Sequence, residues 1–379
     1  MTDPTNLEDT SSPDWESIAS KVGADLAAGV AERDRSGAIS LSGFKAIVEA
    51  GISRALVPRE FGGGGVSHAQ MGVILRTLGR YDGPTAVTLS MHTHLVAAQV
   101  WRHKHGMDAE RVLRRVADGV LLISTGASDW VGAGGTARRV EDGYIVSARK
   151  SPASGCEVGQ VLVTSIRWEE SPDGPQVIHC SIPMSSEGVS IERTWDTLGM
   201  RASASHTVVL EDVFVPDSSV SLIRPADRWH PVWNTVIGAA MPLIVSAYMG
   251  IGDAVLDLAL EAAGRREGSQ LDSLLGEVVN AHTTAADAVA AMYESAADLT
   301  FDNIDEMAAL TLSRKTTAAG ALIKTGRLAM ELIGGSSYGA ASSLQMHLRD
   351  LLGSQFHPLP RSKQLEFTGR TMRGLSPVG

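Results

Sequence analysis

The stretch RTWDTLGMRASASHTVVLEDVFVP, residues 193–216, separates a middle region rich in β-branched residues from a C-terminal third rich in alanine and leucine. Its second half alternates apolar and polar residues and stops at a proline, which predicts a strand. Its first half is too polar for a core and predicts a compact turn around Leu198–Arg201. The apolar positions of the predicted strand are Val208, Leu210, Val213 and Val215, on either side of the acidic pair Glu211-Asp212.

Length and composition limit the class of protein. The chain has 379 residues, of which 44% are hydrophobic and 20% charged, so it is long enough for two or three domains with substantial cores. The net charge is -10, and no basic run or interleaving of aromatic and basic residues occurs. We therefore expect no nucleic-acid partner. A small-molecule substrate is expected from the motifs of the chain and not from its composition.

The cellular compartment is predicted from cysteine usage and from the N-terminus. Cys156 and Cys180 are too few for a disulfide framework and lack the spacing of metal ligands, which favours a cytoplasmic protein. The start of the chain is acidic and polar, unlike a secretory signal. The most membrane-like run, Ile237–Ile251, is shorter than the roughly 20 residues of a span and contains Pro242, so we expect a buried helix and no membrane.

The periodicity of apolar residues changes twice along the chain. After a disordered lead at 1–12, helical patterns fill a predicted domain at 13–118, and short strands fill a second domain at 119–225. Long helical patterns return in a third domain at 226–379. The predicted helices are 14–35, 41–50, 69–80, 84–105 and 108–117, then 232–266, 271–300, 304–333 and 343–355. The seven predicted strands are 120–125, 136–140, 144–148, 160–165, 176–182, 189–193 and 207–215, with a hairpin turn whose positive φ is assigned to Gly143.

Two histidines, His92 and His94, lie on the predicted helix 84–105. Residues two apart on a helix point to different faces, so the pair is not expected to hold a metal ion jointly, and no metal site is predicted. At least one of them is a candidate to line a cavity, and the alternative is a hydrogen-bonded histidine between helices.

The stretch 193–216 closely resembles the signature in the central β-domain of the acyl-CoA dehydrogenase superfamily. Other motifs of that family follow in the same order. The resemblance implies an α+β fold: an N-terminal α-domain, a central antiparallel β-domain and a C-terminal four-helix bundle. The matching segments are Val57–Gly63, Ser124–Asp129 without the usual Glu-Pro, Gly143–Lys150 with Ala148 in place of a glycine, Glu331–Gly335 and Arg349-Asp350.

The resemblance also implies a flavin between the β-domain and the C-terminal bundle, as FAD, or as FMN if the protein is a monooxygenase. Ser124, Thr125 and Ser154 match positions at the flavin ring, where hydroxyl and backbone N–H groups serve as donors. Arg266, with Arg265 as the alternative register, matches an arginine that reaches the cofactor of a neighbouring subunit. Gly334 and Gly335 match a turn near the adenosine part. A homo-oligomer, dimer or homotetramer, is therefore implied.

The catalytic base is where the sequence departs from the pattern. Acyl-CoA dehydrogenation needs a carboxylate opposite the flavin, and the family's usual glutamate position falls on Pro358. The carboxylates Asp253, Asp257 and Glu261 on the helix 232–266 are not in register with the alternative position. His357 is the remaining candidate, since a histidine suits a general base near neutral pH. It also matches a histidine of the flavin-dependent monooxygenases that share this fold, and His92 and Ser154 lie near positions implicated in that branch.

Three hypotheses follow. The leading one is α,β-dehydrogenation of an acyl thioester, carried by CoA or an acyl carrier protein, with electrons passing to FAD and on to an electron-transfer flavoprotein. The alternative is a two-component flavin-dependent monooxygenase that uses reduced flavin from a partner reductase and O2, with His357 and His92 at the flavin. The third is a flavin-binding scaffold without turnover, which fits the missing glutamate but not the polar groups at the ring.

Overall fold

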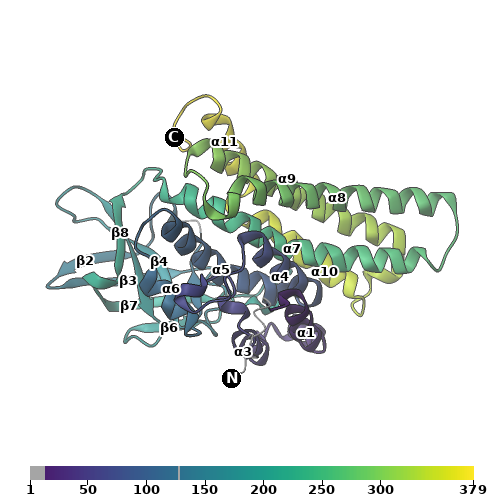
Figure 1. The fold of residues 1–379 in the computed structure, drawn as a ribbon, viewed down its shortest axis with the longest axis horizontal. Coiled ribbons are helices and arrows are strands. Elements are labelled where there is room, and N and C mark those ends of the chain that lie inside the picture. Colours follow the sequence, from purple (N-terminus) through teal and green to yellow (C-terminus); the bar gives the residue numbers. More distant parts are fainter. Residues whose placement is uncertain (1–12, 127–128) are drawn as a thin grey trace, which may run out of the picture.

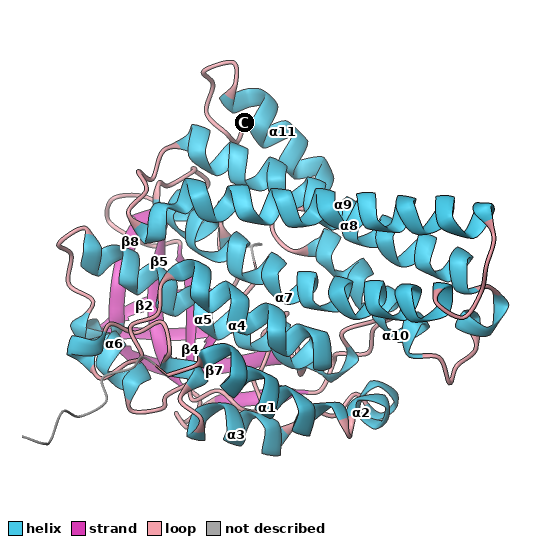
Figure 2. Ribbon diagram, turned by 45° about the vertical axis from the view of Figure 1, so that its right-hand side comes forward, coloured by secondary structure: helices cyan, strands magenta, loops and turns pink. Residues whose placement is uncertain are grey.

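The computed structural model describes residues 13–126 and 129–379, so the predicted disordered lead lies outside the described residues, as do Ala127 and Ser128. Helices come first, then strands, then helices again (Figures 1 and 2). This confirms the predicted three-part fold. The N-terminal helices are α1 (Trp15–Ala27), α2 (Val30–Ser36), α3 (Leu41–Glu49), α4 (His68–Tyr81), α5 (Gly83–Lys104) and α6 (Glu110–Ala117), with the short helices η1 (Ile52–Arg54) and η2 (Arg59–Phe61).

Helix α5 is the centre of the molecule. It is buried on almost all sides, as expected of a helix enclosed by other elements. Asp82 caps it by accepting hydrogen bonds from the backbone N–H and the hydroxyl of Thr85, and Arg33 pairs with Asp82 at 2.7 Å. Because α5 contacts both strands and the long C-terminal helices, its side chains can join the two halves of the structure.

The β-domain consists of two sheets that pack face to face. One sheet has the order β1 (Leu122–Ser124), β4 (Val161–Trp168), β5 (Gln176–Pro183), β8 (Val220–Pro225), and the other has β2 (Thr136–Val140), β3 (Gly143–Lys150), β7 (Thr207–Pro216), β6 (Val189–Glu192). Apolar side chains from both sheets form one buried cluster between them. Strands β1 and β4 pair in parallel, and the other strand pairs are antiparallel. Strand β8 was not predicted from the sequence.

The predicted strand in the stretch 193–216 is β7. Its four apolar residues Val208, Leu210, Val213 and Val215 are all buried, although the spacing changes from two to three in the middle. A β-bulge accounts for this change: Asp212 adopts a positive φ of 50°, and the register with β3 shifts between Val146 and Ala148. The bulge returns the second pair of apolar side chains to the core face.

The hairpin between β2 and β3 differs from the prediction. Asp142, not Gly143, has the positive φ, at 58°. Glycine is needed at position 143 for another reason, because a Cβ there would lie 2.4 Å from the carbonyl oxygen of Val215 on β7. The glycine permits the close approach of two strands and does not make the turn.

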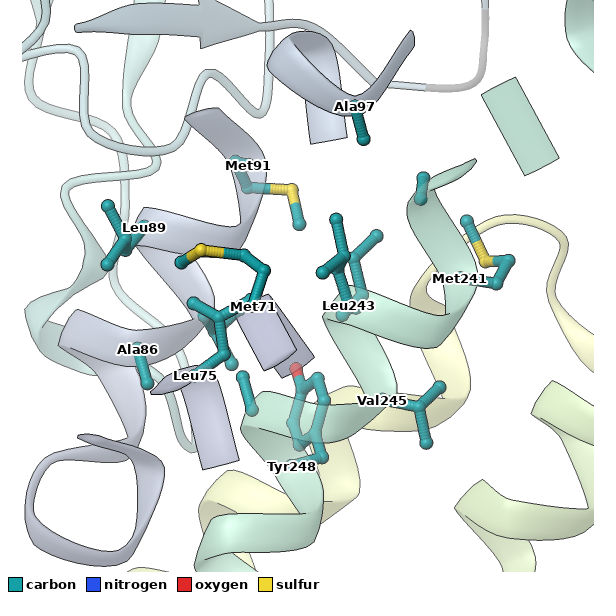
Figure 3. Close-up of a cluster of buried hydrophobic side chains, with 14 of the residues drawn as sticks. Met71, Leu75, Ala86, Leu89, Met91, Ala97, Met241, Leu243, Val245 and Tyr248 are labelled. Carbon is teal, nitrogen blue, oxygen red and sulfur yellow. The ribbon is translucent and has the colours of Figure 1, made fainter. Parts of the chain in front are cut away.

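The C-terminal helices are α7 (Val232–Ala263), α8 (Ser269–Ala296), α9 (Asp305–Ile333), α10 (Ser343–Leu352) and α11 (Arg361–Thr371), of which α11 was not predicted. By length and composition α7 would qualify as a membrane span, but 67% of its most apolar window is buried inside the protein. It packs against α4 and α5 through the apolar side chains of Figure 3, which include Met71, Leu89, Leu243 and Tyr248. The helix is the core of the bundle.

The turn of the stretch 193–216 is fixed by the motif Arg349-Asp350 of α10. Arg349 pairs with Asp34 at 2.6 Å and donates to the carbonyl of Leu198, and Asp350 accepts the N–H of Met200. A Cβ on Gly199 would lie 2.2 Å from the carbonyl of Arg349, so this position requires glycine. Two motifs far apart in the sequence thus form one contact between the β-domain and the bundle.

Candidate active site

His357 lies directly after the short helix η8 (Gly353–Phe356), in the segment that replaces the expected glutamate. Its Nε2 is 2.8 Å from the hydroxyl of Tyr248 on α7. Its backbone carbonyl accepts a 2.5 Å hydrogen bond from Nζ of Lys315 on α9, and Lys315 also donates to the carbonyl of Leu359 at 3.3 Å. Two long helices therefore hold the ring and the backbone of this segment.

The hydrogen bond to Tyr248 determines which nitrogen of His357 carries the proton. Tyr248 is 1% exposed, and its hydroxyl makes no hydrogen bond to any other residue in the described ranges, 13–126 and 129–379. A buried O–H needs an acceptor, so Tyr248 donates and Nε2 of His357 accepts. Neutral imidazole has one N–H, which must then be on Nδ1. Nδ1 makes no hydrogen bond to the described part of the chain and is a donor for a ligand.

The surroundings keep His357 neutral. Burial lowers its pKa to about 3, assisted by the positive charge of Lys315 and by His94. Burial also raises the pKa of Tyr248 well above its ordinary value, with Asp350 adding to the effect, so the phenol keeps its proton. Lys315 is 2% exposed and burial lowers its pKa to about 8. His357, bound to Tyr248, therefore presents a neutral Nδ1–H group. Its ring has no free lone pair that could take a proton.

The two histidines of α5 have different environments. Both nitrogens of His92 are used by the backbone: Nε2 donates to the carbonyl of Ser53 at 2.9 Å, and Nδ1 accepts the N–H of Leu122 at 3.0 Å. His94 donates from Nδ1 to the carbonyl of Ser90 at 3.2 Å, which leaves Nε2 as an acceptor. His92 therefore positions β1 in this structure. Nε2 of His94 has no hydrogen-bond partner among residues 13–126 and 129–379, and the His94 ring contributes to the lowered pKa of His357.

The candidate carboxylates on α7 are all bound to basic side chains. Asp253 pairs with Arg76 at 2.6 Å and with His282 at 2.8 Å, and Asp257 pairs with Arg80 at 2.5 Å. Glu261, one turn further along, pairs with Arg265. The basic partners lie on α4, on α8 and, for Arg265, just after the end of α7. The three carboxylates offer no free base to the His357 segment.

The predicted ring-binding residues lie where the β-domain meets α5. Ser154, in the loop after β3, is partly exposed and its hydroxyl is 2.8 Å from that of Ser205. The hydroxyl of Thr125 is 3.1 Å from that of Thr164 and donates to Asp129 at 3.3 Å. Ser124 is 9% exposed and ends β1, which pairs with β4. Ser154, which is partly exposed, therefore fits the hydroxyl donor that a flavin ring requires, whereas the proton of the Thr125 hydroxyl is directed to Asp129.

The remaining predicted cofactor residues lie at the opposite end of the bundle. Arg266 follows α7 and donates to the carbonyl of Leu332 at 2.9 Å, which brings it beside the turn at Gly334 and Gly335. Helix α7 has 32 residues and is roughly 48 Å long. Figure 1 shows the strands of the β-domain at one end of the molecule and the far ends of the long helices at the other. Arg266 and the glycine turn, which follow the ends of α7 and α9, are therefore far from the β-domain loop of Ser154 within one chain. The structure therefore forms two groups of predicted residues, and one cofactor molecule cannot touch both in a single copy.

Comparisons with known proteins agree with this architecture. Residues 16–120 match the family described as acyl-CoA dehydrogenase, N-terminal domain. The chain is 27% identical to isobutylamine N-hydroxylase of Streptomyces viridifaciens, over 86% of each protein. It is 24% identical to the mitochondrial isovaleryl-CoA dehydrogenase of Solanum tuberosum, over 78% of this chain and 73% of the relative. Among solved structures, KijD3 in complex with FMN and dTDP-3-amino-2,3,6-trideoxy-4-keto-3-methyl-D-glucose is similar with a TM-score of 0.86 and 25% identity, covering 96% of this chain and 95% of KijD3.

Proposed function

Because the chain belongs to the acyl-CoA dehydrogenase superfamily of flavin-dependent oxidoreductases, we propose that it is a two-component monooxygenase. In this proposal a partner reductase provides reduced flavin, and the substrate is a small organic amine that is hydroxylated on nitrogen. The amine plus O2 and two electrons with two protons gives the hydroxylamine and water. When bound, the reduced flavin supplies the two electrons.

The observation that carries the proposal is the hydrogen bond between Tyr248 and His357. A dehydrogenase needs a base with a free lone pair to take the α-proton of a thioester. Here the lone pair of Nε2 is occupied by the Tyr248 hydroxyl, and Nδ1 carries a proton. A fixed neutral N–H suits a different task, the stabilisation of negative charge that develops on oxygen.

The choice of an amine as substrate rests on two of the similar proteins. The name of one describes hydroxylation of isobutylamine, and the other was solved with an amino sugar nucleotide. The free Nε2 of His94 supports this choice, since it is an acceptor for the N–H of an amine. In the proposal His94 orients the amine and His357 donates toward oxygen, while Lys315 and Tyr248 hold His357 in place.

The proposal is tested with purified protein, FMN, a flavin reductase and NADH. Isobutylamine and amino sugar nucleotides are supplied under 18O2, and the products are analysed by mass spectrometry. We expect one 18O atom in a hydroxylamine product or in a product of its further oxidation. Anaerobic mixing of the FAD-loaded protein with a panel of acyl-CoAs is the parallel test. Bleaching of the flavin there, without oxygen insertion in the first assay, would establish a dehydrogenase and refute the proposal.

A further inference from the structure

Three serine hydroxyls form a chain behind the predicted flavin site. The Oγ atoms of Ser154 and Ser205 are 2.8 Å apart, and those of Ser205 and Ser203 are 2.6 Å apart. Ser203 and Ser205 belong to the stretch 193–216 and are only 2% and 3% exposed, whereas Ser154 is partly exposed. None of the three hydroxyls is hydrogen-bonded to any other described residue.

The burial of Ser203 and Ser205 decides in which direction the three hydroxyls donate their hydrogen bonds. Each hydroxyl has one proton to donate, and a buried O–H without an acceptor is unfavourable. If Ser154 donated to Ser205 and Ser205 to Ser203, the proton of Ser203 would be left without an acceptor at a buried position. If both end residues donated to Ser205, the buried proton of Ser205 would be left. Only the direction from Ser203 to Ser205 to Ser154 satisfies both buried hydroxyls.

This direction leaves the proton of Ser154 as the unused one. The family resemblance already implies that Ser154 is a donor at the flavin ring. We infer that Ser203 and Ser205 are positioning residues for this donor, because their hydrogen bonds turn the Ser154 hydroxyl proton outward. Hydrogen bonds in a chain polarise one another, which strengthens the donor at its end. The inference rests on flavin binding, the coarser part of the proposed function, and is independent of the reaction catalysed.

The backbone around the chain is held firmly enough to keep this geometry. The carbonyl of Ser203 accepts the N–H of Gly155 at 3.0 Å and the hydroxyl of Thr88, on α5, at 3.2 Å. The N–H of Ala153 donates to the carbonyl of His206 at 3.1 Å. The loop that carries Ser154 is therefore bound to the stretch 193–216 on both sides of the serine. Thr88 offers a matched control, because its hydroxyl binds the backbone of Ser203 and none of the three serine hydroxyls.

The test is a double-mutant cycle with FMN binding as the readout, measured by fluorescence titration of the full-length protein. We expect Ser154→Ala to weaken FMN binding by about tenfold, the effect of one lost hydrogen bond to the ligand. Ser205→Ala should weaken it by about three- to tenfold in the wild-type background, and by less than twofold in the Ser154→Ala background. Thr88→Val should leave FMN affinity within about twofold, and thermal unfolding confirms that each variant is folded.

Three results would overturn the inference. The first is unchanged FMN affinity in Ser154→Ala, which would mean that Ser154 does not donate to the ligand. The second is a loss of FMN affinity by Ser205→Ala that is as large in the Ser154→Ala background as in the wild type. Such a loss would mean that Ser205→Ala distorts the loop. The third is an effect of Ser154→Ala with none of Ser205→Ala, since Ser154 would then need no positioning. A dehydrogenase result in the activity assays would refute the monooxygenase and leave this cycle unaffected.

Discussion

The hydroxyl of Tyr248 lies 2.8 Å from Nε2 of His357, and this contact joins the central helix of the bundle to the segment where the family's glutamate is expected. It converts a histidine that the sequence offers as a base into a neutral donor. The same segment is held from the other side by Lys315, whose ammonium group binds two backbone carbonyls. The chemistry of the site therefore depends on residues that the family motif does not contain.

The first prediction separates a donor from a base at position 357. An asparagine places an N–H group near the position of Nδ1 of histidine but has no basic nitrogen. We expect His357→Ala to lower kcat for amine oxygenation by about 100-fold, the range seen when one donor to a developing oxyanion is removed. His357→Asn should recover at least a tenth of the wild-type kcat. Equal loss in both variants would argue for proton transfer by His357.

The second prediction concerns the alkaline side of the stability curve. Burial lowers the pKa of Lys315 to about 8, below the ordinary value of 10.5, so between these values the unfolded chain binds the proton that the folded chain releases. The contribution of Lys315 to stability should therefore become more favourable as the pH rises from 8 to about 10. Urea unfolding gives the free energy of unfolding of the wild type and of Lys315→Met. The value of the wild type minus that of the variant should increase from pH 8 to about pH 10. A constant difference would contradict the assignment.

The third prediction concerns acid. Burial lowers the pKa to about 4 for His68, His92, His94 and His347. Unfolding then takes up protons between pH 6.5 and pH 4, so the free energy of unfolding should fall steeply as the pH decreases through this window. The slope of the free energy of unfolding against pH reports the number of protons taken up on unfolding, and urea unfolding at several pH values measures it. Replacing His92 with glutamine should reduce this number by about one. A stability that is flat from pH 7 to pH 4 would show that these rings are not buried as neutral groups.

The fourth prediction tests whether the distal group serves a second copy of the chain. Arg266 and the turn at Gly334 are too far from Ser154 to reach the same cofactor in one chain, so we propose that they contact the adenosine diphosphate part of FAD bound to a neighbour. Arg266→Ala should weaken FAD binding by about tenfold and leave FMN binding unchanged, since an arginine contact to phosphate is a strong hydrogen bond. Sedimentation should show an oligomer. Equal effects on FAD and FMN would contradict this arrangement.

The fold could be predicted from the sequence to a large extent, because its helices and strands carry clear periodicity. Two elements were missed, for physical reasons. Strand β8 is a short edge strand whose buried residue is Arg224, which is hydrogen-bonded to His179 and to three backbone carbonyls. It therefore lacks a pattern of buried apolar residues. Helix α11 is mostly polar and buries little besides Phe367, so its signal is weak as well.

The site was predicted less completely than the fold. The motifs indicated Ser154 and His357. In the structure the Ser154 hydroxyl contacts that of Ser205, and the His357 ring contacts the hydroxyl of Tyr248. Sequence alone could not distinguish His92 from His94, because the difference is which backbone groups occupy the ring nitrogens. Tyr248 and Lys315 are far from His357 in the sequence, and a buried tyrosine or lysine in a long helix carries no local pattern. The apolar run of α7 contains Ser246 as well as Tyr248, so the polarity of Tyr248 did not single it out.

The protonation state of the His357 ring decides whether this residue is a donor or a base. Nitrogen NMR of protein labelled with 15N-histidine, assigned with His357→Asn, reports which ring nitrogen carries the proton at pH 7. We predict a protonated Nδ1 and an unprotonated Nε2 in the wild type, and a mixture of tautomers in Tyr248→Phe, which lacks the hydroxyl that selects between them. A wild-type ring with the proton on Nε2 and a free lone pair on Nδ1 would contradict the assignment of His357 as a donor, because His357 would then be available as a base.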